Sequence, residues 1–214
     1  MDILIYYFIN DNELLELINS DLSYTMDDES IKKANYDSQS ITFWDTGKIT
    51  TMKFMFYYKS TFNELLLWNT MNVSDMSLMF YNASSFNQPI YFNTKKVVNM
   101  SGMFCRTTSF NQPLEFNTDN VTSMCYMFDS ASSFNQPLEF NTENVYDMAR
   151  MFCNARSFNQ PLEFNTENVY DMARMFCEAS SFNQPLEFNT ENVYDMCDMF
   201  KNSGMEITPL WYNE

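Results

Sequence analysis

Hydrophobic side chains recur at a fixed interval of 24 residues through most of the chain. Each interval opens on the dipeptide Phe-Asn, at Phe62, Phe86, Phe110, Phe134, Phe158 and Phe182. A degenerate earlier copy begins at Ser38 and keeps Ile49, Met52 and Phe56 in register. The pattern defines seven repeats: 38–61, 62–85, 86–109, 110–133, 134–157, 158–181 and 182–205. A period in this range is typical of a leucine-rich-repeat-like solenoid.

Two local patterns within one repeat predict its secondary structure. Leu138 and Phe140 alternate with Glu139, which predicts a short parallel strand with the glutamate facing outward. Met148, Met151 and Phe152 have the i, i+3, i+4 spacing of one face of a short helical or 3-10 turn. The predicted fold is therefore a repeat solenoid of short parallel β-strands and short helical turns.

The constant polar residues have a predicted structural role at the bends. Asn135, Asn141 and Thr142 recur at the same positions in neighbouring repeats. Their side chains are expected to form ladders that hydrogen-bond the backbone of the next repeat.

Both ends of the chain depart from the period. Residues 1–37 lack it and contain a short predicted helix after Asn12, so we expect an N-terminal cap there. Residues 206–214 follow the last repeat and are expected to form a C-terminal cap or tail that covers it. A bare edge would favour self-association.

Composition and charge narrow the possible functions. The chain has a net charge of −16 and no histidine. An acidic surface repels phosphate groups, so we expect neither nucleic acid nor an anionic membrane as a partner. Without histidine, a nucleophile–base pair or a phosphate-binding loop, no enzymatic activity is expected, and no cofactor or metal either.

The N-terminal residues predict an unsecreted protein. Asp2 stands where a signal peptide has a basic residue, and no stretch is long enough to span a bilayer. The expected compartment is intracellular, with a surface location reached only by non-standard export.

The repeat 134–157 resembles that of the BspA-like leucine-rich-repeat surface proteins. The resemblance lies in Phe134-Asn135-Gln136-Pro137-Leu138, Asn144-Val145, Met148, Met151-Phe152 and Ala155. It covers about 168 of the 214 residues. It implies a right-handed solenoid with a strand-lined face used for adhesion or protein binding, in bacteria, protists or large DNA viruses.

Two features of this chain depart from that family. Surface members have a signal or lipoprotein segment, which we do not find in this sequence. The family's tryptophan is kept at Trp44 and Trp68 and is replaced by phenylalanine from Phe92 onward, a conservative change in the core.

A column of glutamates is the first candidate binding surface. Equivalent positions on stacked strands lie about 4.8 Å apart, so Glu115, Glu139, Glu163 and Glu187 should form a row of like charge. One interpretation is a seat for a basic partner or a cation. The alternative is a solvated face produced by duplication, since repeats 134–157 and 158–181 differ only at two positions.

A second candidate surface combines tyrosine and aspartate. Tyr146, Tyr170 and Tyr194 are each followed by an aspartate, and tyrosine is favoured at binding surfaces. Arg150 and Arg174 are predicted to pair with these aspartates along or between repeats. An ordinary polar flank is the alternative interpretation.

The five cysteines contain no CxxC pair. Cys153 and Cys177 share one position in consecutive repeats, which would suit a disulfide or a shared metal. Buried thiols that pack against methionine and phenylalanine are the interpretation we favour.

These features predict a non-enzymatic protein-interaction or adhesion module that binds a protein or peptide, favouring basic ones, through the strand face. The alternative is a structural or assembly component, viral or from a surface layer, in which the solenoid is a spacer. The protein is expected to be a monomer, with end-to-end association possible.

Overall fold

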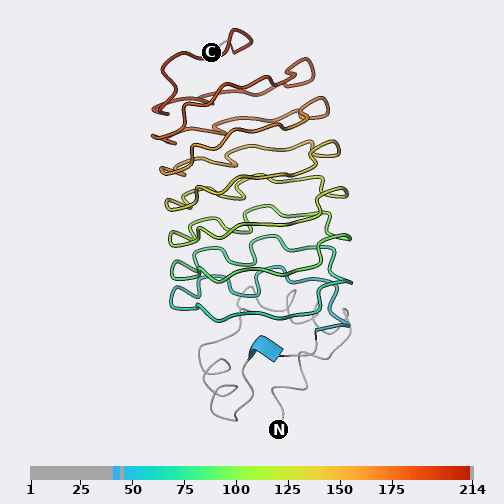
Figure 1. Ribbon diagram of the computed structural model, residues 1–214. Helices are drawn as coiled ribbons and strands as arrows, with labels where there is room; N and C mark the ends of the chain where they lie inside the picture. Colours follow the sequence, from blue (N-terminus) through green and yellow to red (C-terminus); the bar gives the residue numbers. More distant parts are fainter. Residues whose placement is uncertain (1–40, 44–45, 213–214) are drawn as a thin grey trace.

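The computed structural model of the protein describes residues 41–43 and 46–212. Within this range the chain winds as a stack of flattened loops, one above another, from the N-terminal to the C-terminal end (Figure 1). We call each loop a coil and name it by the residues of its repeat. The predicted N-terminal cap, residues 1–37, lies outside the described residues.

Regular secondary structure is sparse in the described residues. One 3-10 helix, η1 (Ile41–Phe43), precedes the stack, and the remaining pairings are isolated parallel bridges. No helix of the described part has the length and apolar character needed to cross a bilayer. The coils are therefore held in shape by turns and by contacts with one another.

Parallel bridges join residues that are one repeat apart. Asp147 bridges Ser123 on one side and Asp171 on the other. Backbone hydrogen bonds extend this pairing along the coil, from Met148 N to Asp171 O at 3.0 Å and from Phe152 N to Met175 O at 2.9 Å. Each interior coil is thus paired through its backbone with the coil on either side.

Two consecutive β-turns occupy the segment with the helical spacing. Met151 N donates to Met148 O at 3.1 Å, and Ala155 N donates to Phe152 O at 3.0 Å. The third residue of each turn has a positive φ, 58° at Arg150 and 56° at Asn154, which defines type II turns. The predicted helical turn is wrong, because two such turns in series bury residues at the same three- and four-residue intervals as a helix.

The predicted strand also differs from the structure. Leu138 and Phe140 are buried and Glu139 is exposed, so the alternation is present. However, Leu138–Phe140 forms no β-strand, and the bridge in this coil lies at Asp147. At the repeat position of Leu138, an isolated parallel bridge joins Leu66 and Ile90 of two earlier coils. The alternation therefore predicts which side chains are buried more closely than it predicts backbone pairing.

Phenylalanine forms two interleaved columns through the core. Phe152 stacks on Phe158 at 4.1 Å between ring centroids and on Phe176 of the next coil at 5.6 Å. Phe158 in turn lies 5.9 Å from Phe182. Methionines such as Met148 and Met151, both fully buried, fill the space beside the rings. Aromatic rings at these offsets contribute about 0.5–1.5 kcal/mol beyond their buried area.

Asparagine and threonine ladders hold the bends of neighbouring coils together. Asn135 Oδ1 accepts the backbone N–H of Asn159 at 2.9 Å, and Thr142 Oγ1 donates to Asn165 O at 2.8 Å. These two ladders are confirmed. Asn141 behaves differently: its Oδ1 accepts the N–H of Glu143 at 3.0 Å within its own turn, and its Nδ2 donates to the Asp119 side chain of the preceding coil at 3.0 Å instead of to backbone.

The left-handed turn residues generate a stability prediction. Asn154 has a φ of 56°, which glycine adopts freely and a β-branched residue does not. We expect Asn154→Gly to change the free energy of unfolding by less than about 0.5 kcal/mol and Asn154→Val to lower it by about 1–2 kcal/mol. Chemical denaturation followed by circular dichroism measures both.

Arg156 provides the control for this substitution. It is exposed and is not among the residues with positive φ. Arg156→Val should leave stability nearly unchanged. An equal loss for Arg156→Val and Asn154→Val would contradict the assignment of the strain to the turn.

Candidate functional site

The glutamate column lies on the outer side of the coil segment that precedes the turn at Thr142–Val145 and its equivalents in other repeats. Glu115, Glu139, Glu163 and Glu187 are exposed, and each lies between two buried apolar residues. In the two preceding coils the same position holds Leu67 and Tyr91, which are also exposed. The column is therefore apolar at its N-terminal end and acidic over the last four repeats.

The three tyrosines form a stacked ladder. The rings of Tyr146 and Tyr170 lie 5.3 Å apart, and those of Tyr170 and Tyr194 lie 5.4 Å apart, each pair inclined by 11°. The backbone fixes this spacing, because Tyr170 N donates to Tyr146 O and Tyr194 N donates to Tyr170 O, both at 2.9 Å. Exposure ranges up to 71% at Tyr194, so the ladder presents an aromatic strip to solvent.

The aspartates beside the ladder have a local structural role. The Oδ1 atoms of Asp147, Asp171 and Asp195 each accept the backbone N–H two residues later, at 3.0, 2.9 and 2.9 Å. Burial raises the pKa of Asp171, and the charges of Asp147 and Asp195 raise it further. The column thus holds three acidic groups close enough to affect one another.

The phenols of Tyr170 and Tyr194 remain protonated at neutral pH. Desolvation raises the pKa of Tyr170 and of Tyr194, and neighbouring aspartate charges add to the effect. Each phenol can therefore donate a hydrogen bond, while the aspartates beside it supply negative charge. The turn between Thr142 and Val145 separates this ladder from the glutamate column.

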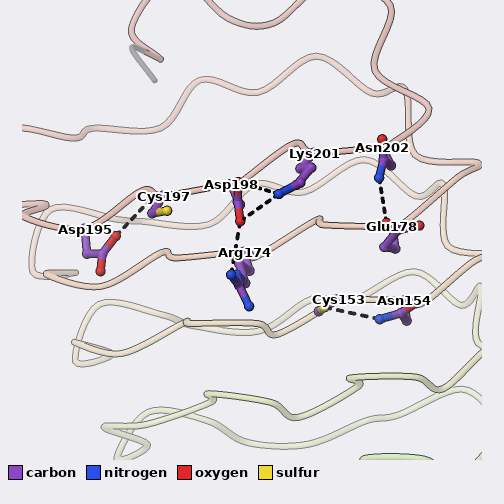
Figure 2. Close-up of polar contacts among 9 residues, drawn as sticks. All are labelled: Cys153, Asn154, Arg174, Glu178, Asp195, Cys197, Asp198, Lys201 and Asn202. Atoms are coloured by element: carbon purple, nitrogen blue, oxygen red, sulfur yellow. Dashed lines mark hydrogen bonds and ion pairs between the residues drawn. The ribbon is translucent and has the colours of Figure 1, made fainter.

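The predicted pairing of the arginines with these aspartates is wrong. Arg150 pairs with Asp129 of the preceding coil at 2.8 Å, and its guanidinium lies 5.1 Å from the ring centre of Tyr126. Arg174 pairs with Asp198 of the following coil at 3.1 Å (Figure 2). Both arginines occupy the left-handed position of the first turn, where the side chain points along the stack and away from the aspartate column.

The cysteines are free thiols. Burial, with a further contribution from Asp129, raises the pKa of Cys105 to about 12 and that of Cys153 to about 11. Cys153 and Cys177 are buried and unlinked. Within the part of the chain that the structure describes, no three potential ligands group around a common metal position. The buried thiols of Cys105 and Cys153 are therefore protonated packing groups at neutral pH.

An aromatic cluster on the first two coils was not predicted. Phe54, Tyr57, Tyr58 and Tyr81 contact one another at centroid distances between 4.7 and 5.4 Å. Lys53 lies 5.1 Å from the ring of Phe54. The available signal was the pair Tyr57-Tyr58 at positions where repeat 134–157 has Cys153-Asn154, but only the fold shows that Tyr81 joins it.

A family comparison covers nearly all of the described stack. The model of the family described as "Mycoplasma protein of unknown function, DUF285" matches residues 22–139, 90–163 and 114–208. The chain belongs to this family. Overlapping matches to one family model fit a chain of tandem repeats, and DUF285 membership is consistent with a BspA-like repeat protein. Comparison with curated proteins and with solved structures returns no match.

The aspartate column generates a pH-dependent prediction. Because the folded-state pKa of Asp171 lies above 3.8, folding becomes less favourable as the pH rises from 3.8 through that folded-state pKa. Asp171→Asn removes the charge and keeps the acceptor, as Asn99 does when it accepts the N–H of Ser101 at 2.9 Å. We expect a gain of about 0.5 kcal/mol at neutral pH, limited by solvent screening, and none well below the unfolded pKa.

Denaturant titrations at neutral pH and in acid measure this difference. Asp75→Asn is the matched control, since Asp75 has the same backbone bond but bridges Thr51 and Asn99, which have no charge. A gain of equal size at Asp75, or one that persists in acid, would show that like-charge repulsion is not the cause.

Proposed function

We propose that this DUF285 protein is a non-enzymatic protein-binding module. Its stack is interpreted as a right-handed, leucine-rich-repeat-like solenoid of the BspA-like type, and its outward columns are the binding surface. This division follows from the coil itself, whose inward positions form one continuous apolar core from Ile41 to Phe200. The outward positions are then available for contacts with a partner.

The stacked ladder of Tyr146, Tyr170 and Tyr194 is the observation that supports this function most directly. Tyrosine is enriched among the residues that dominate binding energy, because it offers a large area at a small entropy cost. Stacking against equivalent rings restricts each side chain before any partner arrives. Because folding has already restricted these side chains, a partner that binds the ladder would cause little further loss of side-chain entropy.

Charge indicates what kind of partner the strip would favour. Asp147, Asp171 and Asp195 follow the three tyrosines, and the glutamate column adds further negative charge on the other side of the bend. A basic protein or peptide would gain from both columns, through ion pairs and through cation–π contacts with the phenol rings. We propose no role for nucleic acid or for a cofactor.

A second candidate function is a structural or assembly component in which the ends of the stack make the contacts. One observation favours it: four backbone amides of the last coil, those of Met196, Asp198, Phe200 and Asn202, have no acceptor among the described residues.

If the ladder binds the partner, substitution of a ladder tyrosine should weaken binding, and substitution of a tyrosine outside the ladder should not. Partners captured from lysate at low salt would be identified by mass spectrometry, purified, and titrated by calorimetry. Replacing Tyr170 by serine is expected to weaken binding about 30-fold, because the loss of a hot-spot side chain costs about 2 kcal/mol. Replacing Glu163 by lysine should weaken the same interaction and reduce its dependence on salt.

Tyr126→Ser is the control, since Tyr126 is exposed at the left-handed turn position and belongs to neither column. It should bind as the unmodified chain does. Capture that yields no partner, or a partner whose affinity is unchanged by every one of these substitutions, would count against the proposed function.

A further inference from the structure

The backbone ladder of the stack has a direction. In coil 134–157 the amides of Met148, Arg150, Phe152 and Asn154 all donate to carbonyls of the next coil, at distances between 2.7 and 3.0 Å. The coil before makes the same bonds to this one, for example from Tyr126 N to Ala149 O at 2.8 Å. Each coil therefore presents donors toward the C-terminal end and acceptors toward the N-terminal end.

The last coil has these donors without acceptors. The equivalent amides belong to Met196, Asp198, Phe200 and Asn202, and none of them bonds to another described residue. In the other direction, Tyr194 O lacks the bond that Tyr170 O accepts from Tyr194 N. An unpaired row of this kind is a template for pairing with another chain.

The C-terminal tail packs on the last coil mainly through side chains. Trp211 Nε1 donates to Leu186 O at 3.3 Å. The Trp211 ring stacks on Phe188 at 5.9 Å. Residues 205–210 and 183–186 line an open groove of about 430 Å³. Tyr212 also packs edge-on against Phe200 at 5.0 Å between ring centroids. The tail side chains thus cover Phe188 and Phe200, while the four amides of the row remain without hydrogen bonds to described residues.

The side chains along the open row point to the preceding coil. Asp198 pairs with Arg174, and Asn202 Nδ2 donates to Glu178 at 2.7 Å (Figure 2). Lys201 pairs with Asp198 within the coil at 3.2 Å. These side-chain contacts stabilise the last coil from below and leave its backbone amides without partners among the described residues.

The first coil presents the complementary row. The carbonyls of Thr51, Lys53, Met55 and Tyr57 occupy the positions that accept bonds in every later coil, and they accept none from the described residues. Among the described residues, Thr50 N likewise has no counterpart of the bond that Tyr170 N makes to Tyr146 O. Within the part of the chain that the structure describes, the two ends therefore match in the type, number and spacing of the groups that form no hydrogen bond.

Charge at the two ends is also complementary. The first coil, residues 38–61, contains three lysines, Lys48, Lys53 and Lys59, and one acidic residue, Asp45. Residues 182–205 contain four acidic residues and one lysine. The chain has a net charge of −16, so a basic first coil stands out against the rest of the molecule.

We propose that two copies of this protein join head to tail, with the last coil of one donating its backbone row to the first coil of the next. This inference rests on the second of the two functions above, and its failure would leave the binding function standing. In this arrangement the rings of the neighbouring copy replace Trp211 and Tyr212 on Phe188 and Phe200. Continuing the repeat register across the junction then places Lys53 beside Asp198 and Lys48 beside Glu191. Such a heterologous contact does not close on itself, so it builds linear oligomers.

Charge reversal at the two ends tests the junction. Sedimentation velocity of the full chain over a range of concentrations should show oligomers that increase with concentration. Lys48→Glu and Glu191→Lys should each raise the apparent dissociation constant at least about tenfold, because each puts like charges together. The chain with both substitutions restores opposite charges and should associate as the unmodified chain does.

Glu167→Lys is the matched control, because Glu167 occupies the position of Glu191 in an interior coil. It changes the net charge equally and should leave association unaffected. Circular dichroism establishes that each variant is folded. A protein that stays monomeric throughout, or a Glu167→Lys chain that loses association as Glu191→Lys does, overturns the proposal.

Hydrogen exchange at the open row gives a second readout. The amides of Met196, Asp198, Phe200 and Asn202 should become protected as the protein concentration rises. Amides in the interior ladder, such as that of Phe152, should show no such change. Oligomers that leave the four terminal amides unprotected would use another surface and would also overturn the proposal.

Discussion

The stack depends on two interleaved columns of phenylalanine that run along its core. Phe152 of one column lies 4.1 Å from Phe158 of the other column. It lies 5.6 Å from Phe176, the next ring in its own column, and the rings are nearly parallel throughout. Rings stay parallel over many coils only if every coil has the same length and shape. One extra residue would move a phenylalanine out of both columns. The strict period of 24 residues is the consequence of this packing.

The turns determine which residues are left to make contacts outside the core. In each coil two residues adopt a left-handed conformation, as Arg150 and Asn154 do; both are partly exposed, while the three side chains between them are buried. The first of these positions holds Leu78, Gly102, Tyr126 and Arg150 in successive coils. Such variation is compatible with the fold because only the backbone conformation is required there. Contacts between coils, including that of Arg150 with Asp129, arise at these variable positions.

The same backbone ladder that stabilises the interior leaves the two ends chemically different. Each interior coil forms backbone hydrogen bonds with both neighbouring coils. Among the described residues, the first coil keeps a row of unbonded acceptors and the last coil keeps a row of unbonded donors. The lateral columns and the ends are separate surfaces, so partner binding and head-to-tail association do not exclude each other. A linear oligomer would extend the tyrosine and aspartate columns as repeated sites, which favours multivalent binding.

The sequence by itself determined the interval between contacting residues and the identity of the core. Phe, Met and Val at fixed positions are buried, and bridged residues are one repeat apart. It also placed Glu139 and Tyr146 outside the core. Only the tertiary structure decided the backbone conformation at Met148–Ala155 and the partners of Arg150 and Arg174, because a helix and two successive turns bury residues at the same intervals. Periodicity records spacing along the chain, while the sign of φ and the pairing between coils depend on hydrogen bonds that form only when the coils stack.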